Sequence, residues 1–376
     1  MMRNKHIFIQ GGLRSPIGKK GGIWKKTIPE DLTASLVKEL ARFHSPDDLL
    51  LATSLGTGGN MARYVALKAD LPIQVLATTL DGQCAGALKA IQVGMAQIIT
   101  GQSACVFVGG MESNTLAPSR NYQKNDPRYD DSISQYEIAQ FAPPALNVSL
   151  LHAAANLAEE LGITPLEMAD WTYQSHQKAI HSVENPYLKE CILPINGVNV
   201  DETLPSNRSY EKWKSLVSRQ LHVINATNTA HKQDGACVLV LKSVSEDNLA
   251  SVKDLCEVVA VRYVAVEPAY APIAFLEAIE KLLMENELAV QDIDCWEVNE
   301  SFALKPLAFQ KKYQVNPEKI NIFGGNLAYG HPFGASGAIG VLHLTQALQV
   351  TCGKWGVFAM SAAGGLGAAV LLRYYK

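Results

Sequence analysis

The stretch from Asp81 to Ser113 reads DGQCAGALKAIQVGMAQIITGQSACVFVGGMES, and a second stretch near the C-terminus has the same plan. The first predicts a turn, a helix of small residues from about Ala85 to Ile99, and a buried strand, ACVFVGG. The second runs from Gly330 to Gly367 and reads GHPFGASGAIGVLHLTQALQ, then WGVFAMSAAGGLG. Helices followed by continuous apolar strands indicate layered α/β packing, with sheets covered on both faces. We interpret the two stretches as an internal duplication.

The chain between the two copies has a different composition. Residues 114–145 are polar, and an amphipathic helix is predicted from about Ala153 to Leu161. A second helix is expected to start at Pro165, since proline favours the first helical position. The apolar stretch ACVLVLK then predicts a return to the first sheet. We predict three units: an N-terminal half from residues 1–113 and 234–257, an inserted loop domain at 114–233, and a C-terminal half at 258–376.

Composition and charge exclude several classes of protein. The 376 residues are 48% hydrophobic and 18% charged, with a formal net charge of −3, and no Lys/Arg run exceeds a pair. A nucleic-acid partner would require a basic face or tail, so none is expected. No apolar run reaches the roughly 18 residues of a membrane helix, and the N-terminus lacks the features of a signal peptide. Seven cysteines without paired spacing favour the cytoplasm. The sequence contains no C-x-x-C or H-E-x-x-H motif, so no metal site is expected.

Two residues at the corresponding turns of the two copies could carry chemistry. Cys84 opens the predicted helix of the first copy, and His331 stands at the matching turn of the second. The positive end of a helix dipole favours a thiolate, so we expect the pKa of Cys84 to be lowered from about 8.5. If the halves pack about a pseudo-twofold axis, the two turns meet at one cleft. Taken alone, each residue could equally be structural, as a buried thiol or a core histidine.

A third candidate follows the predicted strand CWEV. Asn299 and Glu300 come directly after it, and α/β folds place ligand sites at the carboxyl ends of strands. An asparagine in this place can orient a water or a histidine, although an ordinary polar strand end would have the same sequence.

Together these motifs resemble the thiolase family over essentially the whole chain. RSPIGKKGG resembles the N-terminal segment of the family, DGQCAGALKA its nucleophile motif, WEVNESFA its Asn-Glu motif, and GGNLAYGHPFGASGA its histidine motif. The resemblance implies a five-layered α-β-α-β-α fold of two similar halves with an inserted loop domain that binds coenzyme A. It also implies a homodimer or homotetramer.

The resemblance implies a role for each matching residue. Cys84 would take an acyl group from a coenzyme A thioester, which is a substrate and not a bound cofactor. His331 would activate Cys84 and, with a water held by Asn299, form one oxyanion hole. The backbone N–H groups of Cys84 and Ala363 would form the second, and such preorganised donors are often the largest contribution to catalysis.

The last motif departs from the family. Thiolases carry a second cysteine there, the base that deprotonates the acetyl methyl group, and this chain has Ser361 in MSAAGGLGAA. A serine hydroxyl scarcely ionises near neutral pH without an adjacent base, whereas a general base needs a pKa near the working pH. We therefore expect the acylation chemistry to be intact and the carbon–carbon step to be impaired.

The inserted region departs as well. The usual His-Met pair reads Ser149-Leu150, with His152 three residues on, and NATNTAHK replaces the motif resembling TAGNASG. Ala230 therefore stands where a serine faces the coenzyme, and His231 replaces a glycine. The resemblance places contacts with coenzyme A or the acyl group at Ser149, Leu150, Ala230 and Phe302.

The function that these residues favour is a thiolase-like acyl-CoA acyltransferase of the acetyl-CoA C-acetyltransferase type. Acyl transfer to a non-carbon acceptor, or condensation with a decarboxylating donor, is an alternative because neither needs the missing base. A non-catalytic coenzyme-binding or partner subunit is an alternative of another class. GGLGAA matches a dinucleotide fingerprint poorly, because too few residues follow it for a βαβ unit. A cysteine protease is disfavoured because the surrounding motifs match thiolases.

Overall fold

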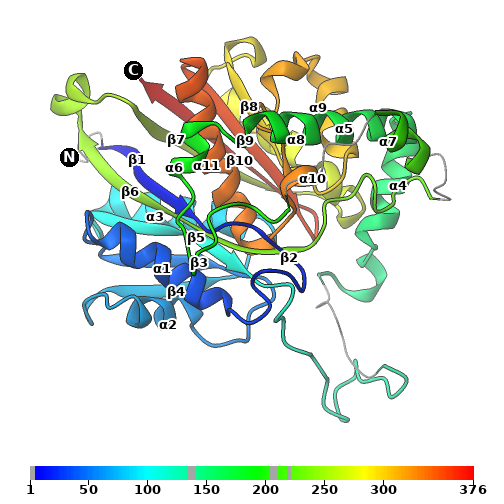
Figure 1. The fold of residues 1–376 in the computed structure, drawn as a ribbon, viewed down its shortest axis with the longest axis horizontal. Coiled ribbons are helices and arrows are strands. Elements are labelled where there is room, and N and C mark those ends of the chain that lie inside the picture. The colour runs from blue at the N-terminus through cyan, green and yellow to red at the C-terminus, as the bar shows by residue number, and fades with distance from the viewer. Residues whose placement is uncertain (1–4, 134–140, 204–209, 218–221) are drawn as a thin grey trace.

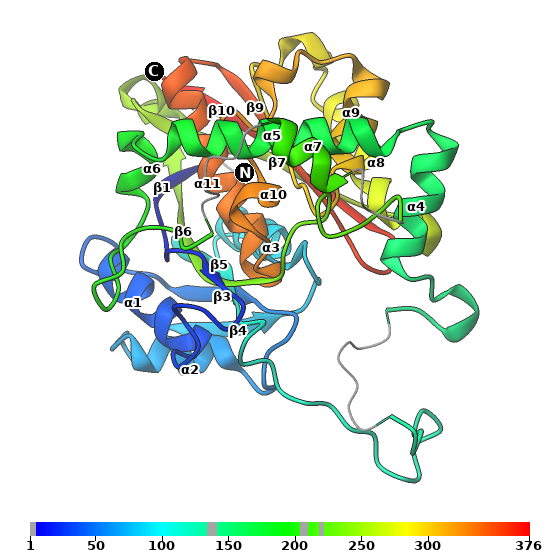
Figure 2. The same cartoon turned by 45° about the vertical axis from the view of Figure 1, so that its right-hand side comes forward.

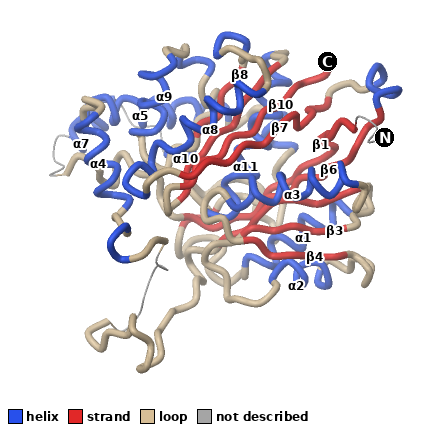
Figure 3. The backbone as a smooth tube through the Cα atoms, turned by 180° about the vertical axis from the view of Figure 1, so that it is seen from behind, coloured by secondary structure: helices blue, strands red, loops and turns tan. Residues whose placement is uncertain are grey.

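The computed structural model describes residues 5–133, 141–203, 210–217 and 222–376 (Figure 1). In these residues the strands form one ten-stranded sheet with the order β4-β3-β5-β6-β1-β7-β10-β9-β8, and β2 pairs with β6 off this path. The strands are β1 (Lys5–Arg14), β2 (Gly18–Lys19), β3 (Asp48–Ala52), β4 (Leu76–Leu80), β5 (Cys105–Glu112), β6 (Gln233–Ser245), β7 (Leu255–Ala265), β8 (Cys295–Val298), β9 (Trp355–Ala362) and β10 (Leu366–Tyr375). Figure 3 shows them as one twisted sheet across the molecule.

Helices precede or follow most of these strands. The α-helices are α1 (Pro29–Ala41), α2 (Met61–Lys68), α3 (Gly86–Thr100), α4 (Leu150–Glu160), α5 (Pro165–Ser182), α6 (Pro186–Glu190), α7 (Tyr210–Val217), α8 (Ala274–Glu285), α9 (Leu304–Tyr313), α10 (Asn326–Tyr329) and α11 (Phe333–Thr351). Short 3₁₀ turns are η1 (Pro144–Leu146), η2 (Glu246–Ser251), η3 (Pro268–Ile273), η4 (Val290–Asp292) and η5 (Pro317–Lys319).

The sheet consists of two halves of the same plan. In the N-terminal half, β5 follows α3 and pairs parallel with β3 and antiparallel with β6. In the C-terminal half, β9 follows α11 and pairs parallel with β8 and antiparallel with β10. The halves meet where Phe8 and Ile9 of β1 pair with Glu257 and Cys256 of β7. The expectation of two similar α/β halves is confirmed.

Three apolar clusters separate the layers. The first lies between the two half-sheets and contains α3 and α11. The second joins the outer face of the C-terminal half to α8 and α9, together with α4 and α5. The third joins the outer face of the N-terminal half to α1 and α2. Figure 1 shows α1 and α2 on one side of the molecule and α8 and α9 on the other, which gives the expected α-β-α-β-α order.

The predicted elements agree closely with the observed ones. The strand CWEV is β8, and α5 starts at Pro165 with a capping box between Thr164 and Glu167. Helix α4 begins at Leu150 rather than near Ala153, because Leu150 packs partly buried on the outer apolar cluster and extends the helix. Figure 2 shows residues 114–133 extending away from the two half-sheets. The domain limits stay a prediction.

The start of α11 lies in very close contact with the end of β5. A Cβ placed on Gly110 would lie 2.0 Å from the carbonyl oxygen of Gly334. A Cβ on Gly334 would in turn lie 2.7 Å from the carbonyl oxygens of Ala52 and Met111. Neither position can carry a side chain without moving backbone, so glycine is required for the two halves to approach this closely.

We predict that Gly110→Ala lowers the free energy of unfolding by about 1–3 kcal/mol, because the added methyl group forces a backbone shift. Urea denaturation measures the loss. Gly235→Ala on β6 is the matched control, since its Cβ would meet no atom closer than 3.6 Å. That control should change stability by less than about 1 kcal/mol. Equal losses in the two variants would contradict the role given to Gly110.

Candidate active site

Four of the five sequence-predicted catalytic residues lie at or just beyond the carboxyl ends of parallel strands. Cys84 lies in the turn between β4 and α3, and Asn299 follows β8 directly. Ser361 lies near the end of β9, and Ala363 follows that strand. His331 lies in the turn between α10 and α11. Open α/β sheets bind ligands at the carboxyl ends of their strands. The strand order therefore places candidate residues from both halves at this edge of the sheet.

The turn before Cys84 is held in an uncommon conformation. Gln83 has a φ of 53°, and its backbone N–H donates to Asp81 Oδ1 at 2.9 Å. Positive φ in a residue other than glycine is costly and persists where the surroundings enforce it, often at functional sites. Among the seven cysteines, Cys84 alone is half-buried; Cys352 is exposed, and the others are buried.

The expected lowering of the Cys84 pKa is wrong. Burial raises the pKa of Cys84 to about 12, because the thiolate loses its hydration, and the charge of Lys305 acts in the opposite direction. The dipole argument fails because α3 begins at Gly86, two residues after Cys84, and because desolvation is the larger effect. Cys84 is therefore a neutral thiol near neutral pH.

His331 is held in one tautomer by its neighbours. Ser336 Oγ donates its single hydrogen to the carbonyl oxygen of Pro332 at 2.9 Å, so it can only accept at the 2.7 Å contact with His331 Nδ1. Nδ1 therefore carries the proton, and Nε2 has a free lone pair that is buried without a hydrogen-bond partner among the described residues. Burial, then the charge of Lys305, lowers the pKa of His331 to about 3, so the ring is neutral.

Asn299 joins the Asn-Glu motif to the histidine motif. Its Nδ2 donates to Asn326 Oδ1 at 2.7 Å, and Asn326 Nδ2 donates to the carbonyl oxygen of Gly330 at 3.0 Å. Gly330 precedes His331 and has a φ of 91°, and a Cβ there would lie 2.1 Å from Gln233 Cγ. The chain of amides therefore fixes the backbone that carries the imidazole.

Lys305 is a site residue that sequence reasoning missed. Its Nζ donates to Asn299 Oδ1 at 2.7 Å and to Ser301 Oγ at 3.2 Å. Its charge acts on both Cys84 and His331, so these residues lie in one site. The signal was available in SFALKPLAF, where a single lysine interrupts an apolar stretch two residues after the motif WEVNESFA.

The hydroxyl of Ser361 is bonded on both sides by backbone groups. Its Oγ donates to the carbonyl oxygen of Pro272 at 3.1 Å and accepts from the backbone N–H of Phe275 at 3.4 Å. These contacts tie β9 to η3 and α8. The single hydroxyl hydrogen is donated to a backbone carbonyl, which is not a base, so no group bonded to Ser361 among the described residues activates it. Ala363 is 5% exposed and lies beside two left-handed glycines.

The four residues expected to contact coenzyme A lie in two places. Thr229 and Phe302 form a β-bridge, and the backbone N–H of Ala230 donates to the carbonyl oxygen of Ser301 at 3.0 Å. The same loop reaches His331, whose N–H donates to the carbonyl oxygen of His231. Ala230 and Phe302 therefore border the site. Ser149 is exposed and Leu150 half-buried at the start of α4, which packs against η3.

No group of three or more His, Cys, Asp or Glu side chains in the described part of the chain could hold a metal ion. Of the helices described, none is long and apolar enough to cross a membrane.

Two family models match consecutive parts of the chain. The thiolase N-terminal domain matches residues 7–245, and the thiolase C-terminal domain matches residues 252–374. The chain belongs to the thiolase family. Membership of this family makes it an acyltransferase-type enzyme.

Individual relatives match the thiolase over almost its full length. A putative acetyl-CoA C-acetyltransferase, VraB, of Staphylococcus aureus strain MSSA476 is 30% identical and covers 95% of this chain and 96% of its own. The putative acetyl-CoA C-acetyltransferase YhfS of Bacillus subtilis strain 168 is 28% identical with the same coverage. The crystal structure of the Bacillus anthracis acetyl-CoA acetyltransferase superposes with a TM-score of 0.90 at 26% identity. It covers 99% of this chain and 100% of that one.

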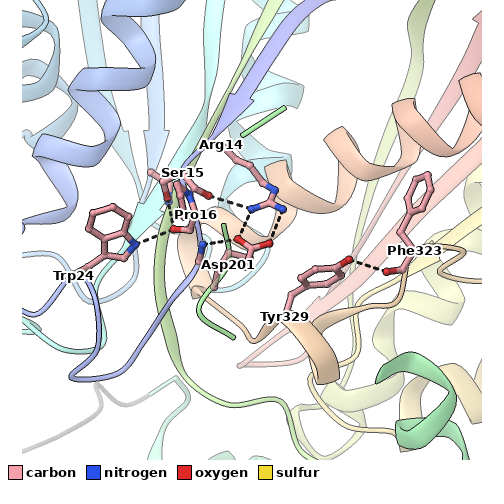
Figure 4. A network of polar contacts seen from close by, with 9 residues as sticks. Arg14, Ser15, Pro16, Trp24, Asp201, Phe323 and Tyr329 are labelled. Carbon is pink, nitrogen blue, oxygen red and sulfur yellow. Dashed lines mark hydrogen bonds and ion pairs between the residues drawn. The ribbon is translucent and has the colours of Figure 1, made fainter. Parts of the chain in front are cut away.

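The N-terminal thiolase segment RSPIG has a structural task here. Arg14 forms a bidentate ion pair with Asp201, at 2.7 and 2.8 Å, and Asp201 Oδ1 also accepts from the backbone N–H of Ile17 (Figure 4). Both side chains of the pair are almost fully buried. The backbone of Arg14 also bonds to Cys191 and Leu193. The segment therefore fastens residues 191–201 to the end of β1, next to the histidine motif.

We predict that Asp201→Asn lowers the free energy of unfolding by about 3–5 kcal/mol, because it leaves a buried guanidinium without its counter-charge. Urea denaturation measures this loss. The exposed pair between Lys38 and Asp70 is the matched control, and Asp70→Asn should cost less than about 1 kcal/mol. A loss in Asp201→Asn no larger than that in the control would show that the buried pair adds nothing.

Proposed function

We propose that this thiolase is an acyl-CoA acyltransferase of the acetyl-CoA C-acetyltransferase type that forms an acyl-enzyme on Cys84. The observations that support the proposal are a half-buried cysteine on a turn with positive φ, and a neutral histidine whose buried Nε2 has no hydrogen-bond partner among the described residues. The charge of Lys305 acts on both residues. The relatives named above are described as acetyl-CoA acetyltransferases, which supports an acetyl donor.

In the first half-reaction, the Cys84 sulfur attacks the thioester carbonyl carbon, and the carbon–sulfur bond to coenzyme A breaks. His331 activates Cys84, and the proton that leaves the thiol goes to the departing coenzyme sulfur. The carbonyl oxygen becomes an oxyanion, for which the backbone N–H groups of Cys84 and Ala363 are the proposed donors. Water exclusion by the buried walls strengthens these interactions.

In the second half-reaction, the acyl group leaves Cys84 for an acceptor. Carbon–carbon bond formation requires an enolate, whose oxygen we assign to a second hole formed by His331 and a water held by Asn299. The hydroxyl of Ser361 donates to the carbonyl oxygen of Pro272, and in this proposal it does not act as the base. This observation favours a second candidate, in which the acceptor is a non-carbon nucleophile or a donor that forms its carbanion by losing carbon dioxide.

The inserted region, residues 114–233, is the proposed binding unit for coenzyme A. Ala230 and Phe302 are buried, and Ala230 bonds to Ser301 of the Asn-Glu motif, which supports them as the proposed contacts with the acyl or pantetheine end. Ser149 and Leu150 at the start of α4 are the proposed second contact. Coenzyme A thioester is then the substrate, and the residues present call for no bound cofactor.

A homodimer or homotetramer is the proposed assembly. β4 ends the sheet, and its five residues are all exposed or half-buried. An edge strand of this kind presents unpaired backbone groups that a second copy could cover. The cytoplasm is the proposed compartment, because all seven cysteines are free thiols.

We predict that mixing the protein with acetyl-CoA, followed by acid quenching, adds one acetyl group to the intact mass. Cys84→Ala should add none, because it removes the attacking sulfur. Cys352→Ala, which removes the exposed cysteine, is the control and should acetylate as the parent does. Absence of an adduct with acetyl-CoA and with longer acyl-CoAs would favour the non-catalytic alternative.

We predict that Ser361→Cys increases the rate of carbon–carbon bond formation or cleavage by about 10²-fold or more, the usual contribution of a general base. Acetoacetyl-CoA cleavage by free coenzyme A measures the rate. Ser361→Ala should retain the slow parent rate, because the serine hydroxyl does not act as a base. No gain in Ser361→Cys would mean that another group supplies the base or that the acceptor is not carbon.

A further inference from the structure

Tyr263 of β7 connects the C-terminal half of the molecule to the turn that carries Cys84. Its hydroxyl donates to the carbonyl oxygen of Ala85 at 2.6 Å, and Ala85 directly follows Cys84. The two bonded residues are 178 positions apart in the chain. The bond is therefore a contact between the two halves of the molecule, made beside the proposed nucleophile.

The ring of Tyr263 is held in place by its packing. Tyr263 and Cys84 are both partly buried, and both pack against the apolar cluster between the half-sheets. The Nζ of Lys89 in α3 lies 5.0 Å from the centre of the tyrosine ring, within the range of a cation–π contact. On the strand side, Tyr263 pairs with Ala368 of β10. A ring held from the strand and from α3 directs its hydroxyl to one place.

Ala85 is the point at which the turn becomes a helix. It is the N-cap residue of α3, and its side chain forms no capping bond. Its N–H donates to the carbonyl oxygen of Gly82 at 3.2 Å, and its carbonyl oxygen accepts from the N–H of Leu88 at 3.0 Å. These bonds stay within the segment. The hydroxyl of Tyr263 adds a donor from another part of the chain.

The two ends of the turn are held by different parts of the molecule. On the upstream side, Asp81 accepts from the N–H of Gln83, two residues away. On the downstream side, the donor is Tyr263, which belongs to the same half as His331. The place of the sulfur relative to the imidazole therefore depends on the bond from Tyr263, in addition to the glycine junction between β5 and α11.

We infer that Tyr263 is a positioning residue for the acylation of Cys84, because its hydroxyl holds the nucleophile turn against the half of the molecule that carries His331. The inference deepens the proposed function and rests on it. In this role Tyr263 exchanges no proton and forms no covalent bond. It acts through Ala85 on the place of the Cys84 sulfur and of the Cys84 N–H, the proposed oxyanion donor.

The phenol is suited to a purely positional role. Burial raises the pKa of Tyr263 well above its usual value, so the hydroxyl keeps its proton. A donor that keeps its proton holds the Ala85 carbonyl throughout the neutral pH range. Small displacements matter at such a site, since a misplacement of about 1 Å can cost about 10²-fold in rate.

The test is the rate of Cys84 acetylation in Tyr263→Phe, which removes the hydroxyl and keeps the ring. Acetyl-CoA is mixed with the protein at several concentrations, the reaction is quenched in acid at short times, and the intact mass is measured. The maximal rate should fall about 10- to 10²-fold, because the turn loses its anchor in the other half. The acetyl-CoA concentration at half-maximal rate should stay within about twofold, since the proposed coenzyme contacts are unchanged.

Tyr313→Phe is the matched control, because it removes the same kind of bond away from the site. Tyr313 ends α9, is partly buried, and its hydroxyl donates to the carbonyl oxygen of Leu276 at 3.0 Å. The urea midpoints of the two variants should decrease by similar amounts, whereas only Tyr263→Phe should acetylate slowly. Amide hydrogen exchange of the peptide that contains Cys84 should become faster in Tyr263→Phe and not in Tyr313→Phe.

A Tyr263→Phe variant that acetylates at the parent rate overturns the inference, as does an equal loss of rate in Tyr313→Phe. A loss that comes only from a higher half-maximal concentration of acetyl-CoA also overturns it, because that result places Tyr263 in binding. In each of these cases the parent is still acetylated, and the proposed function stands. If the parent itself takes no acetyl group, the proposed function fails, and the role of Tyr263 in acylation fails with it.

Discussion

The contact between the end of β5 and the start of α11 is the constraint on which the rest of the site depends. Gly110 and Gly334 let the two backbones approach to a distance that excludes any side chain. Glu112 completes the junction, because its buried carboxylate accepts from the N–H groups of Gly334 and Ser54. A negative charge at the start of a helix is stabilised by the helix dipole. Without this junction, the turns that carry Cys84 and His331 would belong to two separate half-sheets.

Burial then sets the chemistry of the groups that meet there. The thiol, the imidazole and the amine all lie where their charged forms lose hydration, so each is pushed towards its neutral form. Cys84 is therefore a thiol near neutral pH, and a nucleophilic role for it requires the loss of that proton.

The departure from the thiolase pattern at Ser361 concerns the group proposed for the carbon–carbon step and not the groups proposed for acylation. The groups proposed for acylation, a cysteine, a neutral histidine and an asparagine, are present, and Asn299 bonds to Asn326 of the histidine motif. The group that carbon deprotonation needs is replaced by Ser361, whose hydroxyl bonds to η3. Where thiolases with a second cysteine carry the base, this chain carries a hydroxyl that bonds to the backbone of η3. Membership of the family therefore fixes the fold and the class of enzyme, while the proposed choice of acceptor rests on this one position.

The sequence by itself determined the two half-sheets, the strand CWEV, the start of α5 and the motifs that carry Cys84, Asn299 and His331. These are local signals, since periodicity, caps and glycine turns act within a few residues. Only the tertiary structure decided which groups are charged. The pKa values of Cys84 and Lys305 depend on residues far apart in the chain, because both halves together remove these groups from water. The tautomer of His331 depends on the fold of the turn around it. Desolvation is a property of the assembled site, and no single stretch of sequence contains it.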